Sequence, residues 1–166
     1  MIKKVVIVGA GNVATHLGKA IKNAGFQILQ IVSRTENSAR ALGTLLGVPF
    51  TSSEGELNKE ADLYIVSVKD DAITEALRTF TPPTDALIVH TAGSVSMEIL
   101  KDFSSNIGIF YPLQTFSKAK DVDFSQIPLY IEANNKDKEN ELLLFASTFS
   151  TRAKLVDSEN RAKVHL

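Results

Sequence analysis

The sequence predicts an α/β fold of the doubly wound type, in which helices cover both faces of a mostly parallel sheet. Short apolar runs typical of fully buried strands alternate with helical patterns along most of the 166 residues. In the first of these units, an apolar run at 4–8 passes through two glycines directly into a helical pattern. Strand–helix alternation of this kind favours parallel strands joined by helical crossovers.

Eight strands and six helices follow from these patterns. The strands are expected at Lys4–Val8, Gln27–Val32, Val48–Phe50, Leu63–Ser67, Ala86–His90, Ile107–Tyr111, Leu129–Glu132 and Ala153–Val156. The helices are expected near Asn12–Ala24, Ser38–Leu46, Ser53–Asn58, Asp71–Phe80, Ser94–Phe103 and Lys136–Phe149. We assign residues 1–156 to one domain. Residues 157–166 have the pattern of the first turns of a further helix, and we expect them to begin a truncated C-terminal helical domain.

Composition excludes several classes of function. The net charge is −1 and the Lys and Arg residues form no stripe, so no nucleic-acid partner is expected. The absence of cysteine excludes disulfides, thiolate nucleophiles and cysteine-based metal sites. No metal-ligand spacing stands out elsewhere, and no metal is expected. Apolar runs stay short of membrane-spanning length, so we expect a cytoplasmic protein with no membrane partner.

The motif Gly9-x-Gly11-x-x-Ala14 follows the first strand and opens the first helix. Gly9 permits a tight turn, Gly11 lets the backbone approach a pyrophosphate, and Ala14 keeps the helix close to the strand. The new helix offers the N–H groups near Asn12 and Val13 and the positive end of its dipole. A dinucleotide site is therefore predicted; the alternative is an ordinary strand–turn–helix whose glycines serve packing only.

The spacing of the first helix also predicts its two faces. Leu17 lies on the apolar face, and Gly18 lies on the side that faces the sheet. His16 falls on the polar face and is expected to be solvated. Gly25 is in the position that commonly ends a helix.

The second strand ends in Ser33-Arg34-Thr35, where an NAD-binding protein usually has a carboxylate for the ribose 2′-hydroxyl. Arg34 can pair with a 2′-phosphate, and Ser33 and Thr35 can donate hydrogen bonds to it. We therefore expect NADP rather than NAD. The alternative is that Ser33 or Thr35 caps the next helix and Arg34 is a solvated surface residue; Glu36 is expected to point outward.

With these motifs the chain resembles the superfamily of pyrroline-5-carboxylate reductases and F420-dependent NADP oxidoreductases. It is most similar to the N-terminal domain of Rossmann-like proteins that carry a helical C-terminal domain of unknown function. The resemblance spans essentially the whole chain and rests on Gly9–Ala14, Ser33–Thr35, Ala61–Asp70, His90–Ser94 and Phe110–Phe116. It implies a Rossmann fold and an NADP cofactor.

The resemblance also implies positions for further site residues. Val68, Lys69 and Asp70 match positions that line the cofactor, and Thr91, Ala92 and Ser94 would lie near the nicotinamide. In that superfamily a helical second domain completes the pocket for a small-molecule substrate and often forms a homodimer. Such a domain is not contained in these 166 residues.

Structural roles compete with these functional ones. Asp70 or Asp71 is expected to cap the helix that follows, and Ser94 to cap the next one. His90 ends a strand where α/β proteins bind ligands, but a packed histidine fixed in one tautomer is the commoner outcome. Tyr111 borders the nicotinamide pocket or packs at the sheet edge. No catalytic residue is assigned.

These features predict an NADP-dependent oxidoreductase that transfers hydride between the nicotinamide and a small carbonyl or imine substrate. A non-catalytic module that senses the dinucleotide would need the same glycine turn and stays open. An S-adenosylmethionine methyltransferase is a poorer match, because those sites usually want a carboxylate where Arg34 stands.

Overall fold

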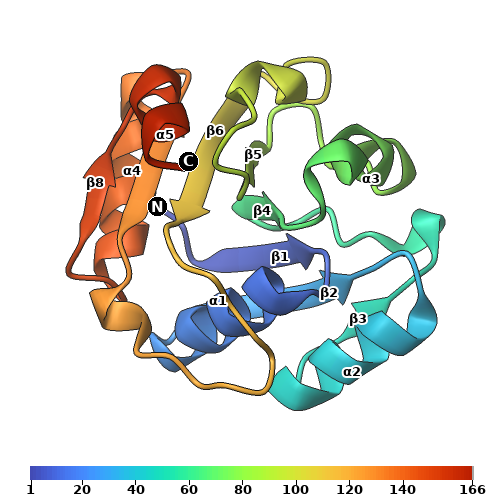
Figure 1. Ribbon diagram of the computed structural model, residues 1–166. Coiled ribbons are helices and arrows are strands. Elements are labelled where there is room, and N and C mark those ends of the chain that lie inside the picture. The colour runs from blue at the N-terminus through green and yellow to red at the C-terminus, as the bar shows by residue number, and fades with distance from the viewer. Residues whose placement is uncertain (166) are drawn as a thin grey trace.

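Helices and strands alternate through residues 1–165, the part of the chain that the computed structural model describes (Figure 1). The strands are β1 (Lys4–Val8), β2 (Gln27–Val32), β3 (Phe50–Thr51), β4 (Leu63–Val66), β5 (Leu87–His90), β6 (Asn106–Pro112), β7 (Leu129–Ala133) and β8 (Ala153–Leu155). The α-helices are α1 (Asn12–Asn23), α2 (Glu36–Leu46), α3 (Ile73–Thr79), α4 (Lys136–Ser147) and α5 (Ser158–His165). Leu166, the last residue of the segment 157–166, lies outside the described residues.

The strands form one sheet in the order β3-β2-β1-β4-β5-β6-β7-β8. Strands β1 to β6 are parallel, β7 runs antiparallel to β6, and β8 runs parallel to β7. From β1 the chain first builds β2 and β3 on one side, then crosses back to build β4, β5 and β6 on the other. The predicted doubly wound, mostly parallel α/β fold is confirmed.

Both faces of the sheet are buried, which explains why the strands are continuous apolar runs. Val5 and Ile7 of β1 face the layer formed by α1, α2 and α4, whereas Val6 and Val8 face the layer that contains α3. All four side chains are at most 1% exposed. The apolar pattern that indicated strands therefore also fixes a three-layer arrangement.

Two predicted helices are much shorter in the structure. Of Ser53–Asn58, only a 3-10 turn at Glu54–Glu56 forms, because the Gln30 side chain of β2 binds the carbonyl of Glu56 and the N–H of Asn58. Of Ser94–Phe103, only a 3-10 turn at Met97–Leu100 forms. The carbonyls of Gly93 and Val95 accept from the Arg161 side chain instead of from helical N–H groups, so the helix does not begin at Ser94.

A helix after residue 157 was predicted and is present as α5, the dark red helix in Figure 1, which contacts Glu132 of β7. Whether residues 157–166 begin a second domain stays a prediction. Within residues 1–165, no helix is long and apolar enough to cross a membrane.

Candidate functional site

The glycine turn after β1 is fixed by its neighbours. Gly9 has a φ of +122°, a conformation that side-chain-bearing residues rarely adopt. A Cβ at Gly9 would lie 2.0 Å from the carbonyl oxygen of Ser67, which follows β4. The Gly9 N–H donates to the carbonyl of Val32 at 2.7 Å, so the turn is also tied to the end of β2. Only glycine fits here.

Gly11 has the opposite surroundings. It is exposed and is the N-cap residue of α1, and a Cβ built on it meets no atom within 4 Å. No side chain caps α1, and its first turn carries no acidic residue. Asn12 is exposed and Val13 half-buried, so the first turn of the helix opens to the surface. The backbone N–H groups at a helix start in such a place can bind a phosphate.

Two small residues bring α1 close to the sheet, as the sequence predicted. Ala14 is fully buried, so its methyl group serves packing rather than ligand contact. A Cβ on Gly18 would lie 2.8 Å from a methyl of Leu46 and 3.5 Å from a methyl of Ile7. Gly25, at a φ of +93°, follows the last turn of the helix as expected.

The end of β2 presents Ser33, half-buried, and Arg34 and Thr35, both exposed. Thr35 caps α2: its Oγ1 accepts from the Ser38 N–H at 3.3 Å, which is the structural role foreseen for it. The Arg34 guanidinium forms no hydrogen bond or ion pair with any residue in the described part of the chain. Glu36 points outward, as expected, and pairs with Arg40 one turn along α2.

After β4, the turn lies against Gly9. The Ser67 N–H donates to the carbonyl of Val8 at 2.8 Å, and the Val68 side chain would be 3.2 Å from a Cβ at Gly9. Lys69 and Asp70 are exposed. The expectation that Asp70 or Asp71 caps the next helix is wrong: the cap residues are Lys69 and Ala72, and neither forms a side-chain cap.

The loop after β5 is held by His90, which is fully buried. Its Nδ1 accepts from the Ala92 N–H at 3.1 Å, so Nε2 carries the proton and donates to the Ser96 carbonyl at 3.2 Å. Burial lowers the pKa of His90 to about 4. The imidazole is therefore neutral near pH 7 and has both nitrogens engaged, which confirms the packed, tautomer-fixed interpretation.

The residues that follow His90 differ in exposure. Thr91 is half-buried and donates to the Ser67 hydroxyl at 3.3 Å, whereas Ala92 is only 7% exposed. Ser94 is exposed and does not cap a helix, contrary to expectation. Ser96 does so instead, because its hydroxyl accepts from the Glu98 N–H at 3.1 Å.

Tyr111 lies near the end of β6, half-buried, with its ring centroid 6.3 Å from that of Tyr130. Burial, and after it the negative charge of Asp70, raises the pKa of the Tyr111 phenol. The phenol therefore keeps its proton at neutral pH.

The four predicted segments all follow the carboxyl ends of adjacent parallel strands. They are Gly9–Ala14 after β1, Ser33–Thr35 after β2, Val68–Asp70 after β4 and Thr91–Ser94 after β5. Between β1 and β4 the order of the sheet reverses direction, and open α/β sheets bind their ligands at such a point. The sequence-predicted residues are thus brought to one edge, with Ala14 behind it.

His16 is not solvated, contrary to the prediction, and is 3% exposed. Its ring stacks on Phe116 at 5.2 Å, and Nε2 donates to the Ser117 carbonyl at 2.5 Å. The segment after β6 crosses α1 (Figure 1), and Phe116 and Ser117 of that segment contact this histidine. Nothing local in the sequence signals the contact, because the partners lie about 100 residues away.

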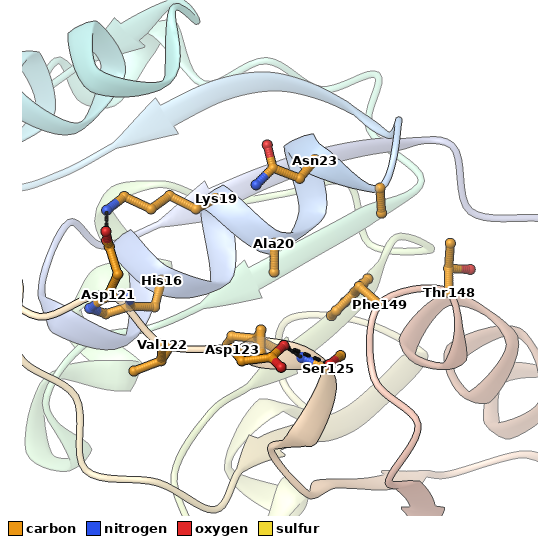
Figure 2. Close-up of a pocket in the computed structure, with 12 residues that line it drawn as sticks. His16, Lys19, Ala20, Asn23, Asp121, Val122, Asp123, Ser125, Thr148 and Phe149 are labelled. Carbon is orange, nitrogen blue, oxygen red and sulfur yellow. Dashed lines mark hydrogen bonds and ion pairs between the residues drawn. The ribbon is translucent and has the colours of Figure 1, made fainter.

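A cavity of about 510 Å³ lies farther along the same helix, away from the glycine turn. Figure 2 shows it between α1 and the segment around Asp123, with Lys19 paired to Asp121 at 3.3 Å across its mouth. None of the residues predicted for the cofactor lines this cavity.

Sequence reasoning also missed Arg161 and Glu132, a buried ion pair beside the loop after β5.

Comparison with known proteins identifies the group to which the chain belongs. A family described as NADP oxidoreductase, coenzyme F420-dependent, matches residues 4–93, which include the segments after β1, β2, β4 and β5. The chain belongs to this family. Members of this family depend on NAD(P). The resemblance to its superfamily, which was inferred from the sequence, is confirmed.

Several solved structures are similar to this chain. A candidate NADP oxidoreductase from Bacteroides fragilis is 44% identical, with a TM-score of 0.93 over 99% of this chain and 64% of that one. A pyrroline-5-carboxylate reductase from Coxiella burnetii is 18% identical, with a TM-score of 0.76 over 98% of this chain and 62% of that one. A prephenate dehydrogenase from A. aeolicus, solved with NAD⁺, is 12% identical, with a TM-score of 0.82 over 97% of this chain and 62% of that one.

The last two likenesses concern the fold alone. The chain spans less than two thirds of the length of each of these three proteins. No curated protein matches its sequence.

Proposed function

We propose that this chain binds NADP(H) and forms the cofactor domain of an oxidoreductase that acts on a small carbonyl or imine compound. The observation that carries the proposal is the uncapped start of α1 beside Gly11. The N–H groups of its first turn, near Asn12 and Val13, would bind the pyrophosphate. The open space at Gly11 lets the phosphates approach the backbone, and Gly9 holds the turn in place.

The end of β2 supports the phosphorylated form of the dinucleotide. Arg34 is exposed and has no competing partner in the described part of the chain, so its guanidinium is available for a 2′-phosphate. Glu36, the nearest carboxylate in the sequence, is paired with Arg40 at 2.5 Å. Ser33 adds a hydroxyl donor, whereas the Thr35 hydroxyl caps α2 and donates to Ser38 Oγ at 2.8 Å, a bond that it would have to exchange for one to the phosphate.

When bound, the nicotinamide would supply or accept hydride at its C4 atom. The residues of this chain bind and orient it. We assign Val68, Lys69 and Asp70 to the middle of the cofactor and Thr91, Ala92 and Ser94 to its nicotinamide end, following the order of the strands. His90 shapes the last loop but donates no proton, because its remaining N–H is held by Ser96.

The test is a titration of the chain with NADPH and NADH, followed by cofactor fluorescence, for the wild type and Arg34→Ala. A charge-assisted hydrogen bond contributes about 1.5 to 3 kcal/mol, so we expect NADPH affinity to fall roughly 10- to 150-fold. NADH affinity should change less than twofold. Arg40→Ala is the matched control, because Arg40 lies one turn along α2 and already pairs with Glu36.

Two results would contradict the proposal. Binding of neither nucleotide by the wild-type chain would remove the cofactor site itself. Equal losses of NADPH and NADH affinity in Arg34→Ala would show that Arg34 does not contact the 2′-phosphate.

We further propose that the substrate pocket is completed by a helical domain that follows residue 156 and that pairs two copies in a homodimer. This proposal rests on the greater length of the three solved relatives. Light scattering and a screen of small carbonyls and imines, made with a protein of the relatives' length, would test it. A monomer that oxidises NADPH with none of these compounds would contradict it.

A further inference from the structure

Arg161 is the largest of the fully buried side chains in the described part of the protein, at 1% exposure. It belongs to α5, and the three residues that follow it in this helix, Ala162, Lys163 and Val164, are all exposed. An arginine is rarely buried unless its charge is paired and its donors are satisfied. Within the described residues, polar contacts of Arg161 and Ser158 hold α5 on the protein.

The contacts of Arg161 reach two distant segments. Nη1 pairs with Glu132 Oε1 of β7 at 3.1 Å. Nε donates to the Gly93 carbonyl at 3.0 Å, and Nη2 donates to the Val95 carbonyl at 2.7 Å. Glu132 also accepts from the N–H and the hydroxyl of Ser158, both at 2.7 Å, which fixes the start of α5. The guanidinium thus connects an anchored helix to the loop after β5.

The two carbonyls flank Ser94, an exposed residue of that loop. The peptide between Gly93 and Ser94 is trans, so its C=O and N–H point in opposite directions. When Arg161 binds the Gly93 carbonyl, the Ser94 N–H is turned away from the guanidinium. Arg161 thereby sets the orientation of the residue proposed to meet the nicotinamide.

His90 holds the ends of the same loop through Ala92 and Ser96. Arg161 adds the contacts in the middle, which no other side chain in the described part of the protein makes. Without the guanidinium, the Gly93 and Val95 carbonyls would lose these donors, and the loop would be fixed only at its two ends.

We propose that Arg161 is a positioning residue that holds the loop after β5 against the nicotinamide half of the cofactor. The inference rests on the proposed function and extends it to the C-terminal helix. It makes α5 part of the cofactor site, although α5 need not touch the cofactor.

The experiment compares two ligands on the same 166-residue chain. NADPH spans the whole site, whereas adenosine 2′,5′-bisphosphate has the adenosine and its 2′-phosphate but no nicotinamide. In Arg161→Gln we expect NADPH affinity to fall at least tenfold and affinity for adenosine 2′,5′-bisphosphate to change less than twofold. Lys163→Gln is the matched control, because Lys163 is on the same helix and, within the described residues, its one ion pair is with Glu159 of that helix.

A merely structural role for Arg161 would give other results. Equal weakening of both ligands, or no change in either, would overturn the inference. Adenosine 2′,5′-bisphosphate binding by the wild type shows that the adenine side of the proposed site is intact. A wild-type chain that binds neither ligand would instead overturn the proposed function, and this inference with it.

Arg161→Lys keeps the inference testable if the glutamine variant does not fold. A lysine retains the charge opposite Glu132 but cannot reach Glu132 and both carbonyls with a rigid fork of donors. We expect a smaller, still selective loss of NADPH affinity and faster amide hydrogen exchange in residues 91–96. Unchanged NADPH affinity and exchange in a folded Arg161→Lys chain would overturn the inference.

Discussion

Alanine substitution of the two glycines in the turn after β1 is expected to affect two different properties of the protein. Gly9 and Gly11 are two residues apart, and each can be changed to alanine by adding one methyl group. At Gly9 the methyl would lie 2.0 Å from a backbone oxygen, and at Gly11 it would meet nothing within 4 Å. Gly9→Ala should therefore affect folding, and Gly11→Ala should affect ligand binding.

The magnitude for Gly9→Ala has two parts. Holding alanine at a φ of +122° costs about 1 to 3 kcal/mol. Forcing an added methyl into an already packed place costs a further 1 to 3 kcal/mol or so. The obstacle is the Ser67 carbonyl, which belongs to the backbone and so cannot rotate away as a side chain would. We expect a loss of about 4 kcal/mol, or roughly 10 °C in Tm for a chain of this size.

Gly11→Ala should lower the free energy of unfolding by less than about 1 kcal/mol, because alanine is a poorer N-cap than glycine but meets no clash. The methyl would nevertheless stand where a pyrophosphate approaches the start of α1. We therefore expect NADPH affinity to fall by at least 30-fold or so, a loss near 2 kcal/mol.

Urea unfolding and an NADPH titration on the same samples measure both effects. A Gly9→Ala protein with the wild-type unfolding midpoint would refute the steric argument at that turn. A Gly11→Ala protein that folds normally and binds NADPH with unchanged affinity would refute the placement of the phosphates at α1.

Two further predictions concern the histidines. Because the folded-state pKa of His90 is about 4, below the usual 6.5, its neutral form favours folding above pH 6.5, and this contribution is lost as the pH falls from 6.5 to 4. The free energy of unfolding should fall by about 3 kcal/mol over this pH range in the wild type. His90→Asn should not show this fall, and identical pH-dependent unfolding curves for the two proteins would contradict the assignment. His16→Ala should lower the unfolding free energy by about 2 kcal/mol, because it removes a hydrogen bond and a ring stack. Urea unfolding checks this against Lys19→Ala, which breaks only the exposed pair with Asp121 and should cost less than about 1 kcal/mol; equal losses would contradict it.

Two strands could be predicted to the residue, and β4 and β5 to within one residue, because their signal is local. Lys4–Val8 and Gln27–Val32 have the bounds expected from the sequence, since a strand buried on both faces is a continuous apolar run. The turn at Gly9 and the open position at Gly11 also follow from local pattern. The sequence-predicted site segments therefore lie together at one edge of the sheet.

What could not be predicted depends on partners far along the chain. His16 binds a carbonyl 101 residues away, and Arg161 binds one 68 residues away. The helix expected from Ser94 failed for the same reason, since distant side chains take the carbonyls of that segment. A helical period shows which face a residue occupies but not which loop later covers that face.

The ends of four parallel strands are joined into one unit by hydrogen bonds already described. Gly9 binds the end of β2, Ser67 binds the end of β1, and Thr91 binds Ser67. Loops connected in this way lose little conformational entropy when a ligand arrives, because they are ordered beforehand. The edge is thus preorganised, and more of the interaction energy with a dinucleotide remains as affinity.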